Sequence, residues 1–100
     1  MTVRTKEDAQ RILKRAPEDK HFFTHDGAIL SNLYELKSAL EKMDRATYGH
    51  HVSEGKNDFS RWVREVLGDD KLANDLMKVA SQQDAVKLVA ERITWLRARA

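Results

Sequence analysis

The residues from His50 to Val63 read HHVSEGKNDFSRWV, and they mix polar side chains with core-forming ones more densely than any other segment. Two histidines, two acids and a glycine share these positions with two large aromatics. Asn57 or Asp58 predicts the start of a helix, because a side-chain oxygen at an N-cap accepts an unpaired backbone N–H of the first turn. The residues leading into it, around Gly49 and Gly55, are expected to form a loop or a short helical turn.

The residues that follow this N-cap predict an amphipathic helix. Apolar side chains recur at spacings of three and four residues, which places them on one helix face: Phe59, Trp62, Val63, Val66 and Leu67. Gly68 stands where a glycine in the left-handed conformation commonly ends a helix. This helix is therefore expected to bury an aromatic pair.

Four further helices are predicted from N-cap residues placed before apolar stripes. The first of them runs from about Lys6 to Arg15 and ends before Pro17. After the helix that carries Leu33, Leu36 and Leu40, the chain is also compatible with a further short helix at 46–48. The N-cap residues of the four are Thr5, Ser31 or Asn32, Asp69 or Asp70, and Ser81. The prediction is an all-α fold of about five short helices, in a compact orthogonal or bundle-like single domain over 1–100, with the helix in 1–17 at its periphery.

Residues 18–30 form the least helical segment of the chain. Asp26-Gly27 is a turn signal, since glycine adopts positive φ at no steric cost. Phe22-Phe23 and Ile29-Leu30 flank this turn and are compatible with a hairpin, but two short strands alone are marginal in water. We expect an ordered loop whose aromatics fill the core.

Composition narrows the function classes. The chain has 100 residues and no cysteine, which excludes a disulfide and a thiolate nucleophile within it. No apolar run approaches the roughly 20 residues that span a bilayer, and the first residues form no apolar signal segment. We therefore predict a cytoplasmic protein with no membrane contact.

Histidines and acids suggest a metal-binding or small hydrolytic site around His50 and His51, with Glu54 and Asp58 nearby. His21 and His25 are also four residues apart, the spacing that aligns two imidazoles on one helix face. However, these two precede a turn, adjacent histidines point in different directions, and the HExxH pattern is missing. This site is the second alternative for the function. The leading prediction assigns no catalytic residue, no metal ligand and no cofactor.

Basic residues concentrate at the two ends of the chain. Residues 1–15 carry five Lys or Arg and two acids, and residues 91–100 carry three Arg and one acid, so the ends hold net charges of +3 and +2 in a chain of net charge +2. The first alternative for the function is therefore nucleic-acid binding through the basic N-terminal and C-terminal helices. Its residues are Arg4, Lys6, Arg11, Lys14, Arg15, Arg92, Arg97 and Arg99.

The leading prediction is a non-enzymatic module for protein–protein interaction or self-association. Its wide apolar faces carry more aromatic side chains than one core requires, and such a surplus often contacts a partner. The candidate contact residues are Tyr34, Tyr48, His51 and Trp95, with Met77 as a further exposed side chain.

Several of these residues occur in a familiar order: Asp26-Gly27, Leu30, Leu33, Glu35-Leu36, Leu40, His51-Val52, Asn57-Asp58-Phe59, Trp62-Val63, Leu67-Gly68-Asp69 and Leu72-Ala73. Over residues 22–96 the chain resembles a family of small helical domains of unknown function, found alone or attached to larger proteins. The resemblance implies an accessory module without established chemistry, and it singles out His51, Asn57, Asp58 and Trp62. We expect these four to form a polar knot, in which Asn57 or Asp58 caps the helix and His51 closes over it beside Trp62, because buried polar groups need partners.

Overall fold

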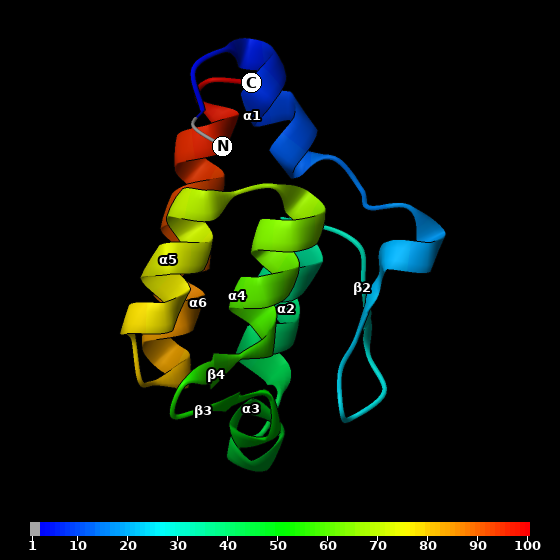
Figure 1. The fold of residues 1–100 in the computed structure, drawn as a ribbon, viewed down its shortest axis with the longest axis vertical. Helices are drawn as coiled ribbons and strands as arrows, with labels where there is room; N and C mark the ends of the chain where they lie inside the picture. Colours follow the sequence, from blue (N-terminus) through cyan, green and yellow to red (C-terminus); the bar gives the residue numbers. More distant parts are fainter. Residues whose placement is uncertain (1–2) are drawn as a thin grey trace.

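The computed structural model describes residues 3–100, so Met1 and Thr2 of the predicted domain lie outside the described residues. Within this part of the chain there are six α-helices (Figure 1): α1 (Lys6–Leu13), α2 (Leu33–Lys42), α3 (Arg45–His51), α4 (Asp58–Trp62), α5 (Asp70–Lys78) and α6 (Gln82–Arg97). A 3-10 turn, η1, spans Glu18–Lys20, and a π-helical segment, η2, continues α4 over Val63–Leu67. The strands are β1 (Phe22–Phe23), β2 (Ile29–Leu30), β3 (Val52–Ser53) and β4 (Lys56–Asn57).

The domain is compact and mostly helical. The sequence predicted a purely all-α fold, and the structure corrects this prediction by adding strands. Helices account for 64% of the domain, and each of the two strand pairs forms a small antiparallel sheet. Both pairs are hairpins around a glycine with positive φ, +95° at Gly27 and +74° at Gly55. Glycine relieves the steric penalty of this conformation, so the two turns are local features of the sequence.

The first hairpin corrects the expectation of a loop at residues 18–30. Phe22 is opposite Leu30 and Phe23 is opposite Ile29 in the β1–β2 register. Phe22 packs against the core, whereas Phe23 is 66% exposed, so the prediction that both aromatics fill the core is wrong for Phe23. The reason is the strand itself, since successive side chains in a strand point to opposite faces.

The second hairpin replaces the loop expected before Asn57. Helix α3 continues through Gly49 as far as His51, and the chain then turns at Gly55, with Val52 opposite Asn57 and Ser53 opposite Lys56. The short helix that the sequence indicated at 46–48 is therefore confirmed and longer than expected.

Capping by polar side chains is the best-predicted feature of the fold. The side chains of five predicted N-cap residues each accept a backbone N–H of the first turn: Thr5, Asn32, Asn57, Asp69 and Ser81. The Thr5 backbone N–H donates in turn to the Asp8 carboxylate, which completes a capping box. Gly68 adopts the left-handed conformation with φ +79°, as predicted. The first helix ends at Leu13, two residues before the predicted Arg15.

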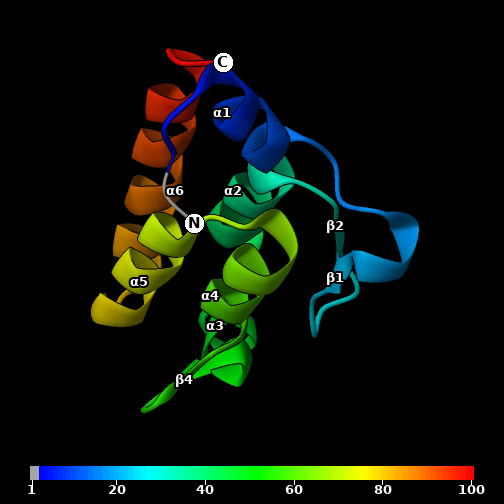
Figure 2. The same ribbon diagram turned by 45° about the horizontal axis from the view of Figure 1, so that its top comes forward.

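Helix α6 organises the core by packing against α1, α2 and α5 (Figure 1). Leu33, Leu36 and Leu40 of α2 are fully buried, as are Ala9 and Ile12 of the N-terminal helix that the sequence places at the periphery. Residues 18–30, which we call the arm, extend along one side of the helical body in both views (Figures 1 and 2). Among the described residues, no helix combines the length and the apolar character needed to cross a membrane.

Candidate functional site

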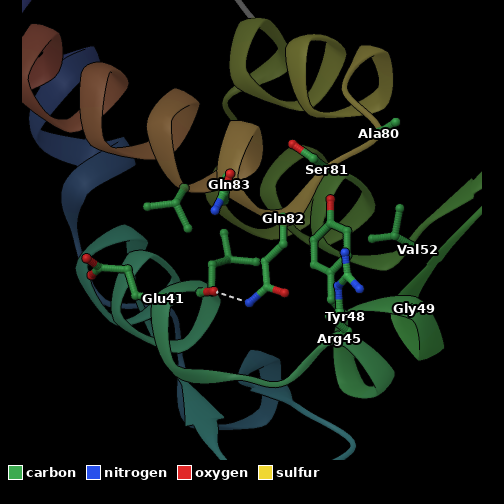
Figure 3. A pocket seen from close by; sticks show the side chains of 11 residues that line it. Glu41, Arg45, Tyr48, Gly49, Val52, Ala80, Ser81, Gln82 and Gln83 are labelled. Atoms are coloured by element: carbon green, nitrogen blue, oxygen red, sulfur yellow. Dashed lines mark hydrogen bonds between the residues drawn. The ribbon is translucent and has the colours of Figure 1, made fainter.

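A hollow lies where the end of α2, helix α3, strand β3 and the α5–α6 connection meet (Figure 3). Its volume is about 860 Å³. We call it the Tyr48 groove, and its lining consists of Leu40, Glu41, Arg45, Tyr48, Gly49, Val52, Ala80, Ser81, Gln82, Gln83 and Val86. Strand and helix ends from four segments thus supply side chains to one surface depression.

Polar side chains fix the walls of this groove. Asp44 caps α3 by accepting the Thr47 N–H at 2.8 Å, and this bond is the main cause that lowers the pKa of Asp44. Gln82 donates to the carbonyl oxygens of Leu40 at 2.7 Å and Met43 at 2.8 Å. Because carbonyls at a helix end have no partner within the helix, Gln82 both satisfies α2 and holds the start of α6 against it.

Tyr48 lies at the centre of the groove with its side chain almost fully enclosed. Its exposed fraction is 7%, and its ring stacks on Phe59 at 6.1 Å between centroids. Within residues 3–100, its hydroxyl is the one buried side-chain polar atom that has no hydrogen-bond partner. In Figure 3 the hydroxyl end is directed toward Ser81. Burial raises the pKa of Tyr48, and the nearby Asp84 carboxylate raises it further.

The four residues of the expected polar knot divide into two groups. His51 is buried, its Nδ1 lies 3.0 Å from Asp58 Oδ2, and its Nε2 accepts the backbone N–H of His25 at 2.9 Å. Asn57 caps α4 by accepting the Ser60 N–H at 3.0 Å, and it donates to the Leu76 carbonyl at 3.1 Å.

Trp62 reaches the arm instead of His51. Its indole N–H donates to the Lys20 carbonyl at 2.8 Å. The ring of Phe22 lies 5.2 Å from His51 and 5.9 Å from Trp62 between centroids. The His51 and Trp62 side chains are thus linked through an aromatic side chain of the arm.

Replacing Asn57 by alanine is expected to lower the free energy of unfolding by about 1–2 kcal/mol, because an N-cap and a buried bond to Leu76 are lost together. Urea denaturation followed by circular dichroism measures the change. Ser53→Ala, on the exposed part of β3, is the control and should leave stability within about 0.5 kcal/mol of the parent. An Asn57→Ala protein as stable as the parent would show that the cap contributes nothing.

The histidines considered as metal ligands do not converge. The His21 Nε2 lies 3.2 Å from the Ala16 carbonyl, while the rings of His25 and His50 stack at 3.9 Å. Both ring nitrogens of His51 already have protein partners. Over the described residues, no group of three or more His, Asp or Glu side chains is arranged to hold a metal ion.

The other interaction candidates lie outside the Tyr48 groove. Tyr34 on α2 is 41% exposed and Met77 on α5 is 49% exposed. Trp95 is half-buried, with the guanidinium groups of Arg92 and Arg99 over its ring at 4.4 and 3.6 Å. Among Tyr34, Tyr48 and Trp95, only Tyr48 is buried and also lines the groove.

The basic ends of the chain meet in the fold, because α1 packs against the C-terminal part of α6 (Figure 1). Arg92 does not belong to this surface, since it forms two bonds of 2.8 and 2.9 Å with the buried Asp69. Arg11 pairs with Asp8 at 2.8 Å, and Arg15 with Glu35 at 3.7 Å. The remaining basic candidates, on α1 or near the chain ends, are Arg4, Lys6, Lys14, Arg97 and Arg99.

Two features of the site were missed by sequence reasoning. The buried Arg92–Asp69 pair was counted as a surface charge and a simple cap, although Arg92 lies between Val89 and Leu96 on the buried side of α6. The Tyr48 groove depends on the hydrogen bonds from Gln82 to the end of α2, and no local sequence pattern predicts a contact between residues so far apart in the chain.

No protein-family model, curated protein or solved structure matches the chain. The resemblance noted for residues 22–96 therefore stays a hypothesis.

Proposed function

We propose that this protein is a non-enzymatic, cytoplasmic interaction module whose Tyr48 groove binds an extended peptide segment of a protein partner. The observation that carries the proposal is the buried hydroxyl of Tyr48, which has no hydrogen-bond partner. A buried polar group without a partner is unfavourable by about 1–3 kcal/mol, and tyrosine hydroxyls usually find a partner when buried. A bound segment that displaces the side chains over this hydroxyl and presents a carbonyl oxygen to it removes the penalty.

The composition of the groove favours a peptide. Leu40, Val52 and Val86 supply apolar surface, which suits an aliphatic side chain of the partner. Arg45, Ser81 and Gln83 supply side-chain donors along its edge, where main-chain carbonyls of an extended segment have acceptors to offer. A groove that combines both surfaces recognises a segment by side chain and backbone together, as peptide-binding domains commonly do.

Selection from a displayed library of random peptides tests this function. Peptides that bind the parent domain should bind Tyr48→Phe about tenfold more weakly, a loss of about 1.4 kcal/mol for one hydrogen bond. Ala80→Arg, which places a long side chain into the groove, should abolish binding. Tyr34→Phe is the matched control, because it also removes only a hydroxyl, from an exposed tyrosine outside the groove. Equal affinity of the parent, Tyr48→Phe and Ala80→Arg would overturn the proposal.

The basic end formed by α1 and the C-terminal part of α6 supports nucleic-acid binding as a second candidate. The specific observation is the packing of two basic segments that lie at opposite ends of the sequence. Lys14, together with Arg11 and Arg15, also lines a depression of about 290 Å³ beside Gly68. Binding of mixed-sequence DNA should weaken steeply as salt rises from about 50 to 200 mM, because phosphate contacts release counterions. Binding that is undetectable at low salt would remove this candidate.

A further inference from the structure

The arm is held to the helical body by a small number of identifiable contacts. The backbone N–H of His25 donates to His51 Nε2 at 2.9 Å, and the Trp62 indole donates to the Lys20 carbonyl at 2.8 Å. Phe22 packs against His51, Phe59 and Trp62, with ring centroids 5.1 to 5.9 Å away. The hairpin itself pairs only two residues with two, and a two-stranded hairpin is marginal alone. These contacts, together with the buried Leu30 at the end of the arm, therefore decide whether the arm stays in place.

The hydrogen bond from His25 fixes the protonation state of His51. A backbone N–H can only donate, so the Nε2 atom that it meets must carry a lone pair and no proton. The proton of the neutral ring then resides on Nδ1, where Asp58 Oδ2 accepts it at 3.0 Å. A second proton on the ring has only Nε2 to occupy, and there it would face the N–H of His25.

Charged groups surround this bond on every element packed against it. On α3, His50 stacks on His25 at 3.9 Å, and Asp44 at its N-cap acts on His25. On β4, the Lys56 ammonium lies 3.7 Å from Asp58 and donates to the His50 carbonyl. In the arm, Asp26 is bonded to the Thr24 hydroxyl within its own turn. The Asp58 carboxylate contacts His51 at Nδ1 and therefore leaves the conflict at Nε2 unchanged.

The histidine stack adds a second acid-sensitive contact. Partial desolvation by its neighbours lowers the pKa of the exposed His50, and the adjacent His25, His51 and Lys56 lower it further, while Asp58 raises it. A histidine whose pKa is lowered by folding has no effect on stability at pH values above its ordinary pKa. As the pH falls below about 6.5, the unfolded or released form takes up the proton more readily, so the packed form loses stability.

We propose that the arm is an acid-released element: protonation of His51 at Nε2 breaks the bond to His25 and frees the arm from the body. Release uncovers the faces of His51, Phe59 and Trp62 that Phe22 covers at neutral pH. The helical body keeps most of its core, because α2, α5 and α6 pack on one another and Leu30, the last residue of the arm, is the arm's one apolar residue in the buried cluster. The arm thus connects solution pH to the exposure of an apolar surface separate from the Tyr48 groove.

Nuclear magnetic resonance of the parent protein tests this directly. Between about pH 7.5 and pH 5, where imidazoles ordinarily titrate, the backbone amide of His25 should shift with the same midpoint as the ring nitrogens of His51. The protection of the Thr24 amide, bonded to Ala28 across the hairpin, should fall about tenfold after correction for intrinsic exchange. Amides in the middle of α6 should keep their protection. Unchanged arm protection, different midpoints, or a simultaneous loss in α6 would each overturn the proposal.

Two matched variants assign the effect to one ring. His51→Gln removes the titrating group while keeping a polar side chain, so arm protection should no longer depend on pH. His21→Gln removes a histidine of the arm itself, whose ring contacts Ala16 and not His51, and should keep the full pH dependence. An undiminished pH effect in His51→Gln contradicts the proposal. If His51→Gln does not fold, the shared midpoint of the His25 amide and the His51 ring in the parent decides the question alone.

Discussion

Replacing Arg92 by methionine is expected to lower the free energy of unfolding by about 3–5 kcal/mol, because the Asp69 carboxylate then remains buried without its cation. Asp69 is 1% exposed and accepts two bonds from the guanidinium group, at 2.8 and 2.9 Å. It also caps α5 by accepting the Leu72 N–H at 3.2 Å, so the same carboxylate joins two helices. Urea denaturation of parent and variant measures the difference.

Two controls separate the buried charge from the loss of an arginine side chain. Asp69→Asn in the Arg92→Met background removes the unpaired charge and keeps a capping oxygen, so it should recover most of the lost stability. Arg61→Met breaks the exposed pair with Glu65 and should change stability by less than about 1 kcal/mol. An Arg92→Met protein within about 1 kcal/mol of the parent would contradict the structural role of this pair.

Replacing Phe59 by alanine is expected to lower the free energy of unfolding by about 3–5 kcal/mol, the usual effect of removing a buried aromatic ring. Phe59 is 1% exposed, and its ring lies 5.1 Å from Phe22, 5.1 Å from His51 and 6.1 Å from Tyr48. One side chain therefore supports the arm, the buried histidine and the Tyr48 groove.

The Phe59→Ala effect is measured by thermal and urea unfolding. Phe59→Leu fills much of the same volume and should destabilise the protein clearly less than alanine does. Phe23→Ala is the surface control, since this phenylalanine is 66% exposed on the arm. Equal losses from Phe59→Ala and Phe23→Ala would show that burial does not distinguish the two rings.

The helix starts were predictable because their causes are local. Asn57 and Ser81 accept an N–H only three residues ahead, so the sequence around each contains the whole interaction. Gly68 ends its helix for the same reason, through a left-handed conformation that glycine adopts freely.

The hairpins were not predictable from the same kind of signal. The glycines that mark their turns are visible in the sequence, and so are the residue pairs that flank Gly27, but strands of two residues carry no periodicity and are marginal alone. What stabilises β1–β2 is the packing of Phe22 on His51, Phe59 and Trp62, which brings together three separate segments of the chain. Such contacts exist only in the folded molecule.

The functional residues follow the same division. Tyr48 is among the predicted contact residues because the chain carries more aromatics than one core requires, but its unpartnered hydroxyl follows from the approach of α6 to α2 and α3. Arg92 was interpreted as a surface charge because a basic residue near a chain end is usually solvated. Its pairing with Asp69 depends on how α6 crosses the start of α5, which is a tertiary property.

The most direct test of the proposed function is the stability of the free domain carrying Tyr48→Phe. If the buried hydroxyl lacks a partner until a peptide binds, removing it should raise the free energy of unfolding by about 1 kcal/mol while binding of selected peptides weakens. A Tyr48→Phe domain that is less stable than the parent by about 1 kcal/mol would show that the hydroxyl already makes a favourable bond in the free protein, and would contradict the account of the groove.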